Sequence, residues 1–258
     1  LHPFQSEAIQ ILRESSAHLI CVAPTGAGKS RIFQELARDP GRRTLLVSPL
    51  AALARQQAER AASLGIRLVE SGPGTKADPC VSGMWITSPE ALLQPGRRDQ
   101  LRRWNPDLLV VDECHCIPEW GENFRPAFRE IPPLLETFSI PRSLWLTATL
   151  PPAAREQLRK AIGSTVIERG AFSVPSNLFL SVVQVPLADR AEVLQEWVLR
   201  RTGQGIIFVP TREATLRMVR WIGATGKRCI PYHAGMSLEE RRALERQVSS
   251  REPDVVVA

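Results

Sequence analysis

Two short stretches of this sequence carry residue types that could act together on a phosphorylated nucleotide. The first is a run of small residues that ends in a lysine and a serine, Ala23-Pro24-Thr25-Gly26-Ala27-Gly28-Lys29-Ser30. Its small residues would let backbone N–H groups approach phosphate oxygens, while Lys29 could reach the β- and γ-phosphates and Ser30 could ligate Mg²⁺. We interpret the run as a phosphate-binding loop rather than a glycine-rich turn, although Ala23 stands where the strict pattern has glycine.

The second stretch is a pair of adjacent carboxylates, Asp112 and Glu113, followed by His115. Mg²⁺ prefers oxygen ligands, so Asp112 would complement Ser30. Glu113 could then orient and deprotonate an attacking water, and His115 could sense the γ-phosphate. Two acidic residues after a strand are more often a helix cap or a loop, but downstream of a phosphate loop we interpret them as catalytic.

The flanking cysteines Cys114 and Cys116 raise the alternative of a zinc site beside His115. Neighbouring residues cannot easily surround one ion, and the wide ligand spacings of zinc sites are absent. We therefore expect ATP and Mg²⁺ as cofactors and no zinc in this stretch of chain. The five cysteines show no disulfide framework, which fits a reducing compartment.

Alternating strands and helices would position these residues. Nearly continuous apolar runs separated by helical stretches predict an α/β fold with a parallel sheet covered on both faces. Ligands bind such sheets at the carboxyl ends of the strands, which is where both stretches fall. The predicted strands cover residues 18–23, 44–48, 84–87, 108–112 and 143–147.

The alternation stops over residues 169–186, which contain Gly170, Pro175 and Pro186. We predict a domain boundary there. Beyond it we predict helices at 191–201, 213–223 and 238–248, and strands at 205–209, 228–231 and 254–258. The expected parts are an ATP-binding domain over 1–170, an interdomain linker over 171–188 and a partial second domain over 189–258.

Composition adds weaker information. The formal charge of +6 fits a polyanionic partner and a solvated basic surface equally well. No apolar run approaches the ~20 residues of a membrane span, and the first residues lack a signal-peptide layout. We therefore expect a cytoplasmic protein without a membrane partner.

With both motifs in place, the chain resembles the superfamily-2 helicases and, more narrowly, the RecQ family. The sequence from Asp112 to His115 is the DExH form of the second helicase motif, and residues 116–126 look like the aromatic-rich loop by which that family couples DNA binding to ATP hydrolysis. Further segments are similar to other motifs of the family in the same order, and the resemblance covers nearly the whole chain. These segments are residues 48–50, 87–90, 146–149, 176–178, 205–212 and 232–235.

The resemblance implies two RecA-like P-loop NTPase lobes with parallel sheets, the second incomplete. It also implies an ATP-dependent DNA helicase or translocase of DNA repair and recombination, which moves 3′ to 5′ on single-stranded DNA and unwinds duplexes. Single-stranded and tailed duplex DNA would be its partners, with protein partners bound through regions outside this sequence. A bacterial version would associate with the nucleoid.

The same resemblance assigns roles to residues. The adenine base would be read by Gln5, although His2 stands where the family usually has arginine, so the adenine contacts could differ. The remaining nucleotide contacts would come from Thr25, Gly26, Ala27, Gly28, Lys29 and Ser30, and catalysis from Lys29, Asp112, Glu113 and His115, with Mg²⁺ held by Ser30 and Asp112.

Nucleic acid would be held by an aromatic and cationic loop together with several strand-end segments. Bases stack on aromatic faces in such sites. The alternative is that Trp120 and Phe124 anchor the loop in the core, and we expect Phe128 to be a core residue. The expected DNA contacts are Trp120, Phe124, Arg125, Ser48, Thr87, Ser88, Thr211, Arg212 and His233.

The sequence stops at residues 255–258, where motif V of the family should begin, and it contains no motif VI with its arginine fingers. An arginine finger is worth ~10³ to 10⁵ in rate, so we expect these residues to bind nucleotide yet hydrolyse it poorly. Two other readings are open. One is an RNA helicase or a non-unwinding translocase of a defence or modification complex, and the other is a nucleic-acid-binding scaffold with a decayed motor.

Overall fold

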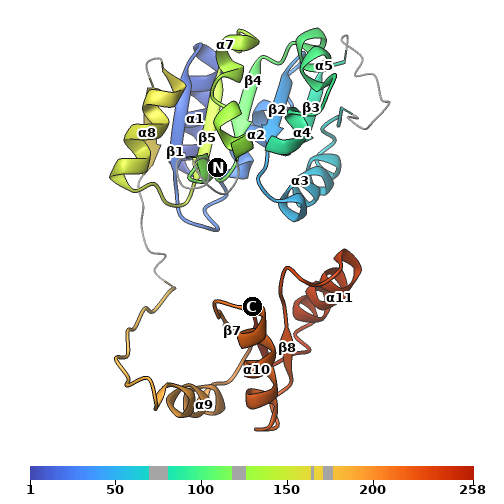
Figure 1. Ribbon diagram of the computed structural model, residues 1–258. Coiled ribbons are helices and arrows are strands. Elements are labelled where there is room, and N and C mark those ends of the chain that lie inside the picture. The colour runs from blue at the N-terminus through green and yellow to red at the C-terminus, as the bar shows by residue number, and fades with distance from the viewer. Residues whose placement is uncertain (70–80, 118–125, 164–165, 171–176) are drawn as a thin grey trace. The chain divides into compact units, whose positions relative to one another are not determined.

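The computed structural model describes residues 1–69, 81–117, 126–163, 166–170 and 177–258. The chain divides into two compact units, Leu1–Phe179 and Leu180–Ala258. Figure 1 shows the helices and strands of each unit. We describe the units one at a time.

Unit 1 is built on a six-stranded sheet in the order β3-β2-β4-β5-β1-β6, and all of its pairs are parallel. The predicted parallel sheet is therefore confirmed, and each of the five strands predicted for this part of the chain forms. Its strands are β1 (His18–Val22), β2 (Arg43–Val47), β3 (Gly83–Thr87), β4 (Leu108–Val111), β5 (Ser143–Thr147) and β6 (Val166–Gly170).

Helices cover both faces of this sheet (Figure 1). In β1, Leu19 and Cys21 pack with α1 (Pro3–Glu14), α2 (Ser30–Leu36) and α3 (Ala51–Ser63). The alternate residues Ile20 and Val22 pack with the helices of the opposite face. This alternation explains why the central strands are apolar throughout. The opposite face carries α4 (Pro89–Leu92), α5 (Arg97–Trp104), the 3₁₀ helix η1 (Pro126–Glu130), α7 (Leu134–Thr137) and α8 (Pro152–Ile162).

The edge strand β6 was not predicted. It pairs in parallel with β1 but is only partly buried, and it carries Glu168 and Arg169. Glu168 forms an ion pair with Arg159 at 2.8 Å, and Arg169 forms one with Glu7 at 2.5 Å. An edge strand with charged side chains lacks the continuous apolar signal of the central strands.

Unit 2 contains a smaller parallel sheet of three strands in the order β7-β9-β8. Its core is formed by Val198, Ile222, Val255 and Val257 with partly buried neighbours. All six elements predicted here form, with ends that differ by at most two residues. They are α9 (Arg190–Arg200), β7 (Gly205–Ile207), α10 (Arg212–Gly223), β8 (Cys229–Pro231), α11 (Leu238–Ser249) and β9 (Val255–Val257).

The described residues 177–186 contain neither helix nor strand. The predicted limits of the linker and of the domains stay predictions, since residues 171–176 lie outside the described part of the chain. Within that part, every helix is too short or too polar to cross a membrane.

Candidate active site

The loops that follow β1 and β4 lie at the carboxyl edge of the sheet of unit 1. Backbone hydrogen bonds join them beyond the strand ends: Ala23 N–H donates to Thr147 O at 3.1 Å, and Cys114 N–H donates to Leu146 O at 2.9 Å. On the other side of β4, Asp112 N–H donates to Val47 O at 3.0 Å. The start of the phosphate loop and the residue that follows the carboxylate pair are therefore both hydrogen-bonded to the end of β5, while Asp112 itself is hydrogen-bonded to β2.

The loop from Ala23 to Ser30 has a backbone suited to anions. Gly26 and Gly28 have φ angles of 82° and 75°, a region that glycine enters without steric cost. No described residue accepts a hydrogen bond from the backbone N–H groups of Gly26, Gly28, Lys29 and Ser30. A Cβ added to Gly26 would meet nothing within 4 Å, so the space beside the loop is open. These features fit a phosphate group.

The Lys29 side chain folds back over its own loop. Its Nζ donates to Ala23 O at 2.7 Å and to Pro24 O at 3.2 Å. Its charge also lowers the pKa values of Asp112 and Glu113, although in each case other effects are larger. The structure thus brings together the lysine and the two carboxylates that the sequence singled out.

The two carboxylates differ in their surroundings. Asp112 is 7% exposed, and burial together with the charge of Glu113 raises its pKa to about 6. A hydrogen bond with His115 lowers the pKa of Glu113, which keeps that side chain ionised. The backbone of Glu113 has a φ of 50°, a left-handed conformation that is rare for a residue with a side chain.

His115 connects the carboxylate pair to the end of β5. Its Nδ1 lies 3.0 Å from Thr147 Oγ1 and 3.3 Å from Glu113 Oε2. Hydrogen bonds with Cys116 and Glu113 raise the pKa of His115 to about 10, which favours the imidazolium form. Thr147 Oγ1 donates to Thr149 O at 2.8 Å and can accept from the imidazolium. Across the described ranges, no group of three or more His, Cys, Asp or Glu side chains could hold a metal ion.

Gln5 lies against the phosphate loop. Its Nε2 donates to Ala27 O at 3.0 Å and to Gly28 O at 2.9 Å, and its Oε1 accepts from His2 N–H at 2.7 Å. Both ends of the amide are therefore engaged within the protein. A cavity of about 340 Å³ adjoins it, lined by Leu1, His2, Gln5 and Arg31. The role of Gln5 in reading adenine stays a prediction.

The residues expected to contact nucleic acid in unit 1 are turned toward the protein where they are described. Ser48 is fully buried, and its Oγ has no hydrogen-bond partner among the described residues. Thr87 Oγ1 donates to Ser88 O at 3.3 Å, and Ser88 Oγ caps α4 by accepting from Ala91 N–H at 3.2 Å. Phe128 lies in the core, as expected. The expected contacts Trp120, Phe124 and Arg125 lie outside the described residues.

In unit 2 the corresponding residues follow the carboxyl ends of β7 and β8. Thr211 caps α10, with its Oγ1 accepting from Ala214 N–H at 3.1 Å. Arg212 lies so close to Gly235 that an added Cβ there would be 2.9 Å from the guanidinium. His233 Nδ1 is buried, and no residue in the described part of the chain forms a hydrogen bond with it.

Comparison with known proteins decides the family. Residues 2–158 match the model of the DEAD/DEAH box helicases. The chain belongs to this helicase family. Among curated relatives, it is 28% identical to the ATP-dependent DNA helicase RecQ of Bacillus subtilis, covering 98% of this chain and 45% of the relative. It is 30% identical to the human ATP-dependent DNA helicase Q4, covering 99% of this chain and 24% of the relative.

The RecQ-type resemblance is therefore confirmed, and the chain spans less than half the length of these relatives. Among solved structures, a similar one is S. cerevisiae Dbp5 bound to RNA and ADP BeF3. The match covers 100% of this chain and 73% of the Dbp5 chain, with a TM-score of 0.67 and 18% identity. This likeness confirms the predicted RecA-like fold and shows nothing beyond the fold.

Sequence reasoning missed one polar residue beside the phosphate loop. Gln57 of α3 donates from Nε2 to Ser30 Oγ at 3.0 Å. Helical periodicity could have found it, because Gln57 lies one turn before the fully buried Ala61 and therefore on the inward face of α3. Nothing in its residue type marked it.

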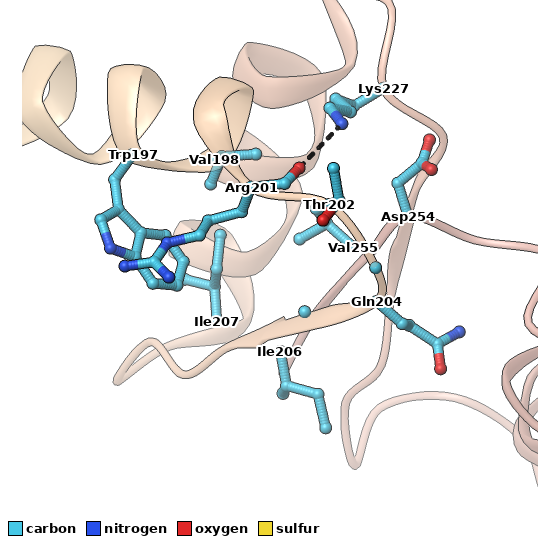
Figure 2. Close-up of a pocket in the computed structure, with 12 residues that line it drawn as sticks. Trp197, Val198, Arg201, Thr202, Gln204, Ile206, Ile207, Lys227, Asp254 and Val255 are labelled. Carbon is cyan, nitrogen blue, oxygen red and sulfur yellow. Dashed lines mark hydrogen bonds between the residues drawn. The ribbon is translucent and has the colours of Figure 1, made fainter. Parts of the chain in front are cut away.

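A further pocket lies in unit 2, with a cavity of about 160 Å³. Figure 2 shows the Trp197 indole beside the Arg201 guanidinium, whose central carbon lies 5.0 Å from the ring centroid. The pocket is lined by Gly205 and Val255, the first residues of β7 and β9. It therefore lies at the amino ends of the strands, opposite to the edge where parallel sheets bind ligands.

Proposed function

We propose that this chain is the motor of a RecQ-type DNA helicase, which uses ATP hydrolysis to move 3′ to 5′ along single-stranded DNA and to unwind duplexes. One observation carries the proposal. Ala23, which begins the phosphate loop, and Cys114, which follows the Asp112–Glu113 pair, are both hydrogen-bonded to the end of β5, so an anion-binding backbone lies beside two carboxylates. Nucleoside triphosphate hydrolysis needs this combination.

The residues of this edge have separate roles in the proposal. The backbone N–H groups of Gly26 and Gly28 and the ammonium of Lys29 bind the phosphates, which requires Lys29 to leave the loop carbonyls that it now contacts. Glu113, held ionised by His115, orients and deprotonates the attacking water. His115 links this carboxylate to Thr147, because its Nδ1 lies within reach of both side chains.

The donors present fit Mg²⁺. Ser30 offers a hydroxyl, and Asp112 offers a buried carboxylate whose pKa is raised to about 6, so a cation would favour its ionised form. When bound, Mg²⁺ neutralises charge that develops on the phosphate oxygens. We further propose that the base occupies the cavity lined by His2, Gln5 and Arg31.

We propose DNA rather than RNA as the polymer, because the curated relatives are named DNA helicases. Single-stranded and tailed duplex DNA would lie along the loops that carry Ser48, Thr87 and Ser88 and along Thr211, Arg212 and His233 of unit 2. The bases would stack on Trp120 and Phe124 beside Arg125. This substrate implies a cytoplasmic location, on the nucleoid in a bacterial cell.

Nucleotide binding tests the motor site directly. We expect the chain to bind a fluorescent ATP analogue in the presence of Mg²⁺, and we expect Lys29→Ala to weaken this binding strongly. Lys160→Ala is the matched control, because Lys160 is exposed on α8 and pairs only weakly with Glu156 at 3.5 Å. Failure of the unaltered chain to bind, or equal binding by the two variants, would refute the proposal.

Polymer choice is tested by measuring ATP hydrolysis with single-stranded DNA, with RNA of the same sequence and without either. Stimulation by DNA alone supports the proposal, and stimulation by RNA alone favours an RNA helicase. We expect Trp120→Ala to remove the stimulation while nucleotide binding persists. Unwinding of 3′-tailed but not 5′-tailed duplexes would support the proposed direction of movement.

A further inference from the structure

Three residues from two helices form a hydrogen-bonded chain at the nucleotide site. Gln57 of α3 donates from Nε2 to Ser30 Oγ at 3.0 Å. Gln34 of α2 donates in turn from Nε2 to Gln57 Oε1 at 3.3 Å. Gln34 is buried and Gln57 is half-buried, so the protein shields much of this hydrogen-bonded row of side chains from solvent.

The directions of these hydrogen bonds matter for the serine. A hydroxyl offers one proton and two lone pairs, and Gln57 occupies one of the lone pairs. The other lone pair stays available to a cation, and the proton can be donated to an oxygen of the nucleotide. Because Gln57 accepts from Gln34 through Oε1, its NH₂ group is directed at Ser30 rather than its carbonyl.

We propose that Gln57 is a positioning residue for Mg²⁺, which holds the Ser30 hydroxyl in the orientation that binds the ion. This inference rests on the proposed nucleotide site. Residues that orient a metal ligand typically change metal affinity about 10- to 100-fold when they are removed. In this role Gln57 would act through Ser30.

The test is a titration of Mg²⁺ into the 258-residue chain with a fluorescent ATP analogue, together with a measurement of analogue affinity in EDTA. We expect Gln57→Ala to raise the Mg²⁺ concentration at half-saturation about 10- to 100-fold and to leave the affinity in EDTA within about twofold. A general loss of folding would weaken both. Gln57→Met, which keeps the length of the side chain but has no donor, should behave in the same way and serves if the alanine variant does not fold.

Gln56→Ala is the control, because Gln56 is the same residue type at the next position of α3 and is exposed. We expect its Mg²⁺ requirement to match that of the unaltered chain. If both Gln57 variants also match it, the inference is overturned while the proposed function stands. If the unaltered chain binds no nucleotide at any Mg²⁺ concentration, the proposed function itself fails.

Discussion

Alanine substitutions at the two phosphate-loop glycines should differ in cost, although the glycines share the same kind of backbone. Both have positive φ, so an added side chain at either is strained by about 1–2 kcal/mol. At Gly26 the new Cβ meets nothing within 4 Å, whereas at Gly28 it would lie 2.7 Å from Gln5 Nε2. Only Gly28→Ala forces a neighbour to move.

The size of the difference follows from what Gln5 loses. The end of its side chain can swing away at little steric cost, but the atom that must move donates both hydrogen bonds to the loop. Each is worth about 0.5–1.5 kcal/mol, and Gln5 is only 4% exposed, so water replaces them poorly. We expect Gly28→Ala to destabilise unit 1 by about 1–3 kcal/mol more than Gly26→Ala.

Urea unfolding measures this difference. Trp85, Trp104 and Trp145 are buried in unit 1 and report its transition by fluorescence. The same two substitutions are then repeated in a Gln5→Ala background, where we expect the difference to fall to about zero. Equal costs in the original background, or a difference that persists without Gln5, would refute the proposed contact.

Two further predictions concern pH and base recognition. Burial lowers the pKa of His18, whose Nδ1 lies 2.8 Å from Ser143 Oγ, so the unfolded chain takes up the proton at higher pH than the folded one. The contribution of His18 to stability should therefore be lost as the pH drops below about 6.5, whereas Asp112, whose pKa folding raises, acts in the opposite direction. We expect His18→Asn, which keeps an acceptor but does not titrate, to gain stability relative to the unaltered chain as the pH is lowered through this range in urea unfolding. Arg31 and Arg38 both pair with Glu35, but only Arg31 lines the proposed base cavity. We expect Arg31→Ala, and not Arg38→Ala, to reduce the preference for ATP over other nucleoside triphosphates in competition binding.

The sequence predicted the parts of this molecule whose signals are local. The central strands are apolar on both faces, and the phosphate loop is a contiguous run, so both could be identified from the sequence. By contrast, β6 was missed because its charged residues Glu168 and Arg169 interrupt the apolar pattern, although the strand pairs with β1. The hydrogen bond from Gln57 to Ser30 joins residues on separate helices, and only the packed structure determines it.

The same distinction applies to residues whose type was informative but whose partners were not. Gln5 was expected to face a base, yet its amide is fully engaged by His2 and the loop carbonyls. Ser48 was expected to face DNA, yet its hydroxyl is buried. A motif identifies the residue type at a position, but the rotamer of that side chain depends on neighbouring residues from other parts of the fold. These two assignments stay predictions for that reason.

The conformation of Glu113 follows from how tightly its neighbours are fixed. Asp112 N–H is held by Val47 O from the side of β2, and Cys114 N–H is held by Leu146 O from the side of β5. One residue separates the two anchors, so the backbone must turn within Glu113, and it does so at a φ of 50°. Strain of this kind persists only where the surroundings over-determine it. The two anchors lie at the end of β2, just before Ser48, and at the end of β5, which is Thr147. A shift of either strand end would therefore reorient the Glu113 carboxylate, which we propose activates water.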